Sequence, residues 1–152
     1  MDDNKAASAG KSAHYRRSRQ EQSWQDEGQR LLTAIKTHEW FLDSSFSLLQ
    51  LSERVALNTN YASHALNYGL GTSFKNILNE LRVDFAKRLI KQDRESLLTI
   101  ALNSGFGSKA SFNRVFLKLT HQTPSQYRYQ SRQESRGKTL APSQTLGGGD
   151  VN

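Results

Sequence analysis

The stretch from residue 104 to residue 128 constrains the fold of this chain more than any other segment. It reads SGFGSKASFNRVFLKLTHQTPSQYR, and Gly105 ends one helical pattern while Ser108 can cap the next helix. Thr123 followed by Pro124 is a typical start for a third helix. Two helices joined by a tight glycine turn form a helix-turn-helix, the motif that places its second helix in the DNA major groove.

Apolar spacing and capping residues predict helices throughout residues 26–130 and strands nowhere, so we expect an all-α domain. Trp40, Phe41 and Leu42 form an apolar turn that we expect to pack against the core. The expected helices cover 26–37, 48–55, 59–67, 73–91, 96–104, 109–118 and a last one from Thr123, with a turn flanked by Gly69 and Gly71 before the longest of them.

The longest expected helix, 73–91, lies between two copies of one pattern. Each copy, at 47–67 and 96–118, has a serine cap, a short helix, a turn and a second helix with a polar face. The linking helix would be roughly 28 Å long at 1.5 Å per residue. Successive major grooves on one face of B-DNA lie about 34 Å apart. The pattern therefore predicts two helix-turn-helix subdomains held in register by a long linker helix.

The two ends of the chain lack apolar periodicity. Residues 1–25 and 131–152 are rich in Ser, Gln, Gly and Arg, so we expect a disordered or linker segment before the domain and a disordered tail after it. The first includes the basic cluster HYRRSRQ, and the second includes Gly147–Gly149. The expected domain is thus 26–130.

The chain is basic, with a formal net charge of +7. The charge is spread as +2, +4 and +1 over residues 1–25, 26–130 and 131–152. A basic balance favours an anionic partner, either nucleic acid or a membrane surface. No apolar run reaches the ~18 residues of a membrane span, and the first residues do not form a secretory signal. With no cysteine in the chain, these features lead us to expect a cytoplasmic protein.

The sequence offers no residues arranged for catalysis. The absence of cysteine excludes thiolate catalysis and cysteine-based zinc sites. The four histidines, at positions 14, 38, 64 and 121, lack the spacing of metal ligands. No Ser-His-Asp set and no glycine-rich phosphate loop is present. We therefore expect neither an enzyme nor a metal or other cofactor.

The region from Phe41 to Tyr129 resembles the DNA-binding domain of AraC/XylS-type transcriptional regulators. IALNSGFGSKASFNRVFLKLTHQTPSQYR is similar to the second helix-turn-helix and signature tail of that family. YGLGTSFKNILNELRVDFAKRLI resembles its linker helix, and NTNYASHALN resembles its first reading helix.

This resemblance implies a module of about seven helices that binds double-stranded promoter DNA and most often activates transcription by contacting RNA polymerase. Two residues depart from the family pattern. Ala56 replaces the usual turn glycine, and Ala62 replaces a larger apolar residue, so the first unit is expected to be looser or less engaged than the second. The usual sensor or dimerisation domain is not found in this sequence. The alternative function is therefore the cytoplasmic output domain of a larger sensor or membrane receptor.

The resemblance also carries site residues onto this chain. In the second unit Lys109, Asn113 and Arg114 match positions that face DNA, and they lie opposite Phe112 and Phe116 on the expected helix. Asn can pair with adenine, and Arg or Lys with guanine, although Arg114 gripping a phosphate is the alternative.

In the first unit the expected base-facing residues are shorter and weaker readers. They are Asn60, Ser63, His64 and Asn67, and a solvated polar face of low specificity is the alternative. The expected phosphate contacts are Tyr61, Thr72, Lys75, Ser108 and Arg128, where Tyr61 in the core and a solvated Arg128 are the alternatives. Arg82 is open to a structural ion pair or a phosphate contact. With no dimerisation helix visible, we expect a monomer.

Overall fold

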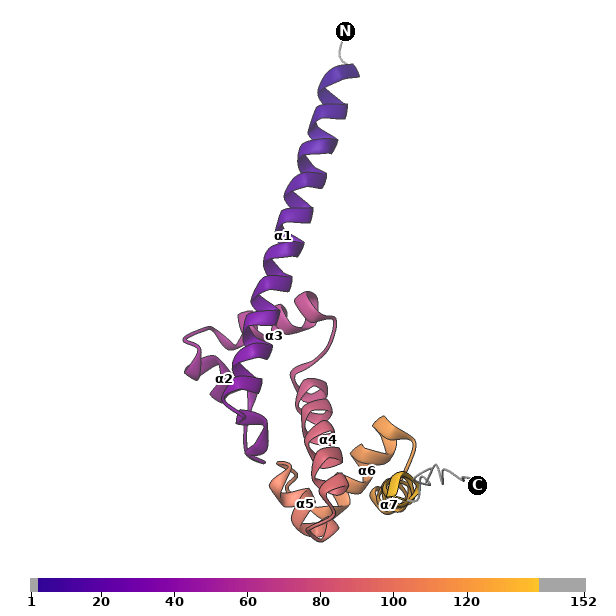
Figure 1. Ribbon diagram of the computed structural model, residues 1–152. Coiled ribbons are helices and arrows are strands. Elements are labelled where there is room, and N and C mark those ends of the chain that lie inside the picture. Colours follow the sequence, from indigo (N-terminus) through magenta and orange to yellow (C-terminus); the bar gives the residue numbers. More distant parts are fainter. Residues whose placement is uncertain (1–2, 140–152) are drawn as a thin grey trace, which may run out of the picture.

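The computed structural model describes residues 3–139, with side chains from residue 9 onward, and these residues form an all-α fold without strands (Figure 1). The elements in chain order are α1 (Asp3–Thr37), the short 3-10 helix η1 (Trp40–Leu42), α2 (Leu48–Arg54), α3 (Thr59–Leu70), α4 (Phe74–Gln92), α5 (Leu97–Asn103), α6 (Lys109–Thr120) and α7 (Pro124–Thr139).

Side-chain caps fix where the helices of both units begin. Each cap accepts a hydrogen bond from a backbone N–H of the first turn, which satisfies a donor that the helix itself leaves without a partner. Ser47 also forms a reciprocal capping box with Gln50. The caps predicted from the sequence are confirmed at Ser47 on α2, Ser96 on α5, Ser108 on α6 and Thr123 on α7, and Asn58 on α3 and Ser73 on α4 act in the same way.

Two hydrophobic cores lie at opposite ends of α4. The first is built from α1, η1, α2 and α3, and α4 contributes Ile77 and Leu78 to it. The second is built from α5, α6 and α7 with Val83 and Ile90 of α4. The linker helix therefore belongs to both units, which explains why its apolar residues continue along its whole length.

The helix α1 begins at Asp3, far earlier than the start predicted from the sequence. Residues 3–25 continue the helix that was predicted to start at 26, so they are helical where we expected a disordered or linker segment. Ala, Gln, Arg and Lys make up about half of this stretch and favour a helix even without apolar periodicity. Likewise α7 continues to Thr139, whereas Gly147–Gly149 and the rest of the expected tail lie outside the described residues.

Two glycines allow α1 and α3 to cross closely. A Cβ on Gly28 would lie 2.7 Å from the carbonyl oxygen of Ala65, and one on Gly69 would overlap the backbone of Trp24. The expectation of a turn at Gly69 is therefore wrong, because Gly69 lies inside α3 and serves this contact. The helix ends instead at Gly71, whose φ of 67° is a left-handed conformation that suits glycine.

Candidate nucleic-acid interface

The helix α6 presents its predicted polar face to solvent. Phe112 and Phe116 are fully buried, while Lys109, Asn113 and Arg114 are all exposed. Among the described ion pairs none involves Lys109 or Arg114, so both cations remain available to an anionic ligand. Ser108 accepts the N–H of Ser111 at 3.1 Å, and its hydroxyl proton can still be donated outward.

The corresponding face of α3 carries amides and a hydroxyl. Asn60 and Asn67 are exposed, whereas Ser63 and His64 are half-buried. The side-chain amide of Asn67 donates to the hydroxyl of Ser63 at 3.2 Å, so these two neighbours orient each other. This face can offer hydrogen bonds in both directions but brings no permanent charge.

One flank of α3 is covered by an aromatic cluster made of Trp24, Tyr61, His64 and Tyr68. The Trp24 ring lies 5.0 Å from that of Tyr61 and 4.4 Å from that of His64, and His64 stacks on Tyr68 at 4.2 Å. Tyr68 is 73% exposed. Trp24 was not predicted as part of this site because its neighbours in sequence are polar, although a lone tryptophan among them was the available signal.

A groove between the two units is lined by three cationic side chains. It is lined by Phe46, Phe74, Lys75, Leu78, Asn79, Arg82, Ser111, Arg114 and Val115. Lys75 is in the first turn of α4, and Arg114 reaches the groove from α6. Thr72 is half-buried just before the cap of α4. Lys75 and Arg114 were predicted separately from the sequence, whereas Asn79 and Ser111 were not, because only the packing of α6 against α4 brings them together.

Arg82 has a structural role in this groove. Its guanidinium donates to the carbonyl oxygen of Phe41 at 2.7 Å and to that of Asp43 at 2.9 Å. Burial lowers the pKa of Arg82, and the Asp43 carboxylate opposes that effect. The two hydrogen bonds hold η1 against α4, so the structural alternative is the one observed, with backbone carbonyls rather than a carboxylate as direct partners.

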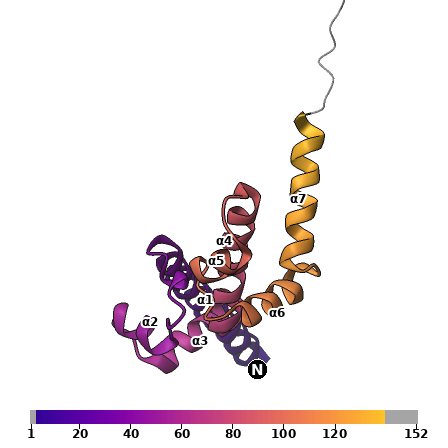
Figure 2. The same ribbon diagram turned by 90° about the horizontal axis from the view of Figure 1, so that it is seen from below.

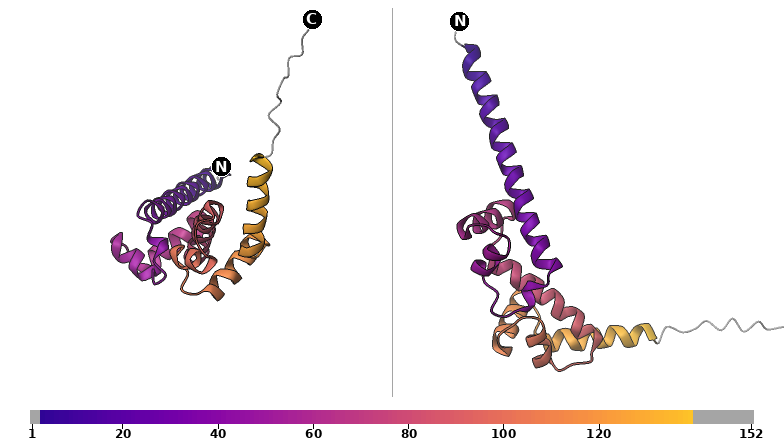
Figure 3. Two further views of the ribbon diagram at one scale, coloured as in Figure 1. Left: turned by 60° about the horizontal axis from the view of Figure 1, so that its bottom comes forward. Right: turned by 90° about the vertical axis from the view of Figure 1, so that its left-hand side faces the viewer.

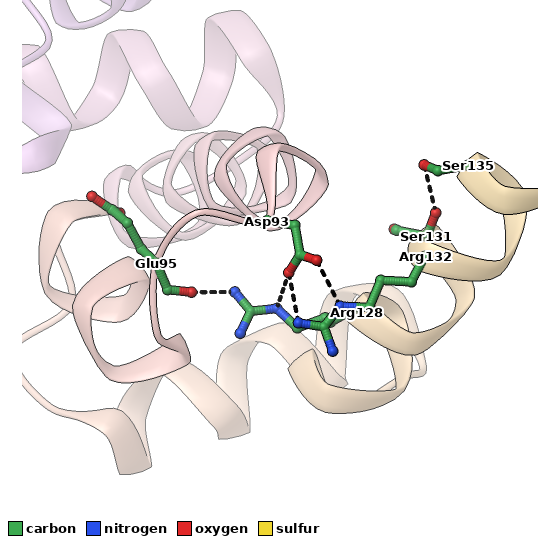
Figure 4. A network of polar contacts seen from close by, with 6 residues as sticks. All are labelled: Asp93, Glu95, Arg128, Ser131, Arg132 and Ser135. Atoms are coloured by element: carbon green, nitrogen blue, oxygen red, sulfur yellow. Dashed lines mark hydrogen bonds and ion pairs between the residues drawn. The ribbon is translucent and has the colours of Figure 1, made fainter. Parts of the chain in front are cut away.

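Arg128 also stabilises the fold, as Figure 4 shows. Its guanidinium donates to the carbonyl oxygen of Glu95 and pairs with Asp93 at 3.4 Å, and its side chain is only 14% exposed. Arg132 makes a bidentate contact with the same carboxylate at 2.7 and 2.8 Å, and this hydrogen bonding lowers the pKa of Asp93. Arg128 therefore fastens α7 to the turn after α4, and contact of Arg128 with a phosphate stays a prediction.

Comparisons with known proteins agree with this geometry. A family model described as "Helix-turn-helix domain" matches residues 51–130. An uncharacterized HTH-type transcriptional regulator of Staphylococcus aureus (strain MSSA476) is 40% identical over 90 residues, 59% of this chain and 12% of that protein. The arabinose operon regulatory protein of Escherichia coli (strain K12) is 33% identical over 86 residues, 57% of this chain and 30% of that protein. The chain belongs to the AraC-type helix-turn-helix family.

A solved structure supports the AraC-type fold over a longer stretch. The C-terminal domain of AraT, a response regulator from Geobacillus stearothermophilus, superimposes with a TM-score of 0.63 at 26% identity, covering 68% of this chain and 84% of that one. The family match starts inside α2, so α1 precedes the matched part of this AraC-type domain. Within residues 3–139 no helix is both long and apolar enough to cross a membrane.

Proposed function

We propose that this AraC-type domain binds a specific double-stranded DNA site by laying α3 and α6 in successive major grooves. The observation that carries the proposal is the placement of the two second helices. They lie toward the same side of α4, and α7 projects to the other side (Figure 2). The 19 residues of α4 span roughly 28 Å, a length suited to holding two helices in grooves one turn apart.

In this arrangement α6 supplies most of the discrimination between bases. Asn113 has the amide that pairs with adenine, and Lys109 and Arg114 have the donors that pair with guanine. On α3, Asn60, Ser63 and Asn67 read bases through neutral hydrogen bonds. His64 lies at the edge of that face, where the aromatic cluster limits its reach.

Phosphate contacts position the domain and supply most of its affinity. Lys75 and Thr72 lie near the start of α4, where backbone N–H groups also attract anions. Ser108 can donate its hydroxyl proton at the start of α6, and Tyr61 can do so from the flank of α3.

We also propose that the domain regulates transcription, as an activator that contacts RNA polymerase, together with a sensor or dimerisation domain. Two observations support this wider role. The relatives are named as regulators, and the chain spans only 12% and 30% of their lengths. The rest of each relative has ample room for a signal-sensing domain.

Fluorescence-anisotropy titrations test DNA reading most simply. The full chain is titrated with a duplex selected from a random library and with a scrambled duplex, each over a salt series. We expect the selected duplex to bind far more tightly than the scrambled one. The logarithm of the affinity should fall with the logarithm of the salt concentration, with a slope near −0.9 per phosphate contact. Equal and weak binding to both duplexes would refute specific reading by this chain.

Substitutions then separate base contacts from phosphate contacts. Arg114→Ala should weaken binding to the selected site by ~1–3 kcal/mol and relax preference at one position. Lys75→Ala should weaken binding to both duplexes by the same factor. It should also reduce the salt dependence of that binding by about 1 unit of slope. Arg94→Ala is the charge-matched control, because Arg94 is exposed in the turn between α4 and α5. If Arg94→Ala had the same effect as Arg114→Ala, the assignment of the α6 face would be wrong.

A further inference from the structure

We propose that the N-terminal half of α1 is a third DNA-binding element, which contacts backbone phosphates of the duplex flanking the groove read by α3. The inference rests on the proposed function and extends it to DNA outside the two grooves.

The chemistry of this segment suits a polyanion. Residues 9–19 include Lys11, Arg16, Arg17 and Arg19, and contain no acidic residue. Every residue of this range is solvent-exposed. None of the four cations takes part in a described ion pair, so their charge is not neutralised within the domain. The nearest acidic residue is Glu21, which lies one helical turn after Arg17.

The direction of α1 also suits this partner. The helix has 35 residues, about 50 Å in length, and only its C-terminal part packs on the domain (Figure 1). Seen from the side in the right panel of Figure 3, the N-terminal part continues past α3 and leans toward the side on which α3 and α6 lie. Under the proposed function that is the side of the DNA.

The junction of α1 with α3 holds this direction. Gly28 and Gly69 let the two backbones touch, and Trp24 is seated among the rings of Tyr61 and His64. A helix anchored by both backbone contact and ring packing cannot swing freely about its base. Its basic half is therefore presented at a defined angle to the reading helix.

The helical repeat decides which cations face the DNA. Arg17 precedes Trp24 by seven residues, two turns of helix, so it projects from the face that contacts α3. Arg16 projects about 100° away from Arg17 on the helical wheel, and its long side chain can reach part of the way round toward that face. Arg19 is two residues from Arg17 and projects from nearly the opposite face. Lys11 lies roughly 20 Å beyond Trp24, a reach of about six base pairs.

Duplex length gives the first test. The full chain is titrated with a selected duplex trimmed to the two grooves, and with the same duplex lengthened by ten base pairs on one side or the other. The base position at which Arg114→Ala relaxes preference marks the α6 half. We expect lengthening on the α3 side to raise affinity several-fold and to steepen the salt slope by about 0.9 per added contact. Lengthening on the α6 side should have no such effect.

Matched variants identify the residues. The double substitution of Arg16→Ala with Arg17→Ala should abolish the gain from the longer duplex and leave binding to the trimmed duplex unchanged. Arg19→Ala should retain the gain, and Glu21→Gln should enlarge it. Alanine keeps the helix propensity of this stretch, and helix content by circular dichroism checks that α1 persists.

Because the chain has no cysteine, Ala13→Cys gives a single attachment point for an iron–EDTA cleavage reagent. We expect strand cleavage confined to the flank beyond the α3 groove.

Specific binding to the trimmed duplex with neither a length effect nor flank cleavage would overturn this inference and leave the proposed function intact. Failure of specific binding to every duplex would overturn both. Loss of binding to phosphatidylserine vesicles in the Arg16 and Arg17 variant, with DNA binding unchanged, would assign the segment to a membrane surface instead.

Discussion

The two helix-turn-helix units of this domain share one backbone plan but are packed differently. In the second unit an aromatic core of Phe106, Phe112, Phe116 and Tyr127 fills the space beneath α6. In the first unit Ala62 occupies the position that corresponds to Phe112, counted from the cap of each helix. Small residues there leave room for α1, which packs on α3 at backbone contact. The first unit is therefore built around an added helix, and the second around its own aromatic residues.

The turns of the two units differ as well. Ala56 has a φ of 56° and Gly105 a φ of 89°, so both adopt a left-handed conformation. Only Gly105 also needs to lack a side chain, because a Cβ there would overlap the carbonyl oxygen of Phe41 and lie 2.9 Å from Nε of Arg82. Ala56 is exposed, so its side chain meets no steric obstacle, and the only destabilisation comes from the left-handed backbone conformation of an alanine. The departure from the family pattern noted in the sequence is thus tolerated at the first turn and would not be at the second.

The largest expected effect is loss of the aromatic core. Phe112→Ala should lower the free energy of unfolding by about 3–5 kcal/mol, because Phe112 is fully buried and contacts the rings of Phe106 and Phe116. Chemical denaturation measures the change. If the free energy of unfolding fell by less than about 1 kcal/mol, the aromatic residues would not be what holds the second unit together.

Next comes the backbone contact that defines the first unit. Gly69→Ala should destabilise by about 1–3 kcal/mol, because the new methyl group meets the backbone of Trp24, which can yield only if α1 moves away. Gly137→Ala is the matched control, since it also lies inside a helix and its Cβ would meet nothing. That control should be neutral or slightly stabilising. Equal effects of the two substitutions would contradict the close crossing of α1 and α3.

A smaller effect of opposite sign is expected at the first turn. Ala56→Gly should stabilise the domain by about 0.5–1 kcal/mol, because relief of the left-handed alanine outweighs the added entropy of the unfolded chain. Thermal denaturation at a fixed pH gives the difference. A destabilised variant would show that Ala56 has a contact role that its exposure does not suggest.

The smallest expected effect concerns acid stability of the second unit. The hydrogen bonds from Arg132, with its charge and that of Arg128, lower the pKa of Asp93. The stabilising contribution of Asp93 is then complete above the pKa of the unfolded chain, near 4, and is lost as pH falls through the lower folded value. Asp93→Asn keeps a residue that tolerates the left-handed φ of 52° and should flatten the decline of stability below about pH 4. Stability measured by chemical denaturation between about pH 2 and pH 6 gives the comparison. If stability fell with pH in the variant as steeply as in the parent, this role of Asp93 would be contradicted.

What the sequence predicted depended on local signals. Caps such as Ser47 and Ser108 act within one turn, and Phe112 and Phe116 mark a buried face by spacing alone, so the helices of residues 48–120 and the exposed face of α6 were predictable. Long-range contacts were not. Trp24 and Gly69 are in contact although they lie 45 positions apart in the sequence, and Arg128 pairs with Asp93 although they lie 35 positions apart. Contact of Lys109, Asn113 and Arg114 with DNA remains a prediction.

The most direct test of two-groove reading is a methylation-interference footprint of the full chain on its selected site. We predict two clusters of major-groove guanines whose methylation blocks binding, centred about one helical turn apart on one face, with the stronger interference in the half read by α6. A single cluster, or two clusters on opposite faces of the duplex, would contradict the account of α3 and α6 as paired reading helices.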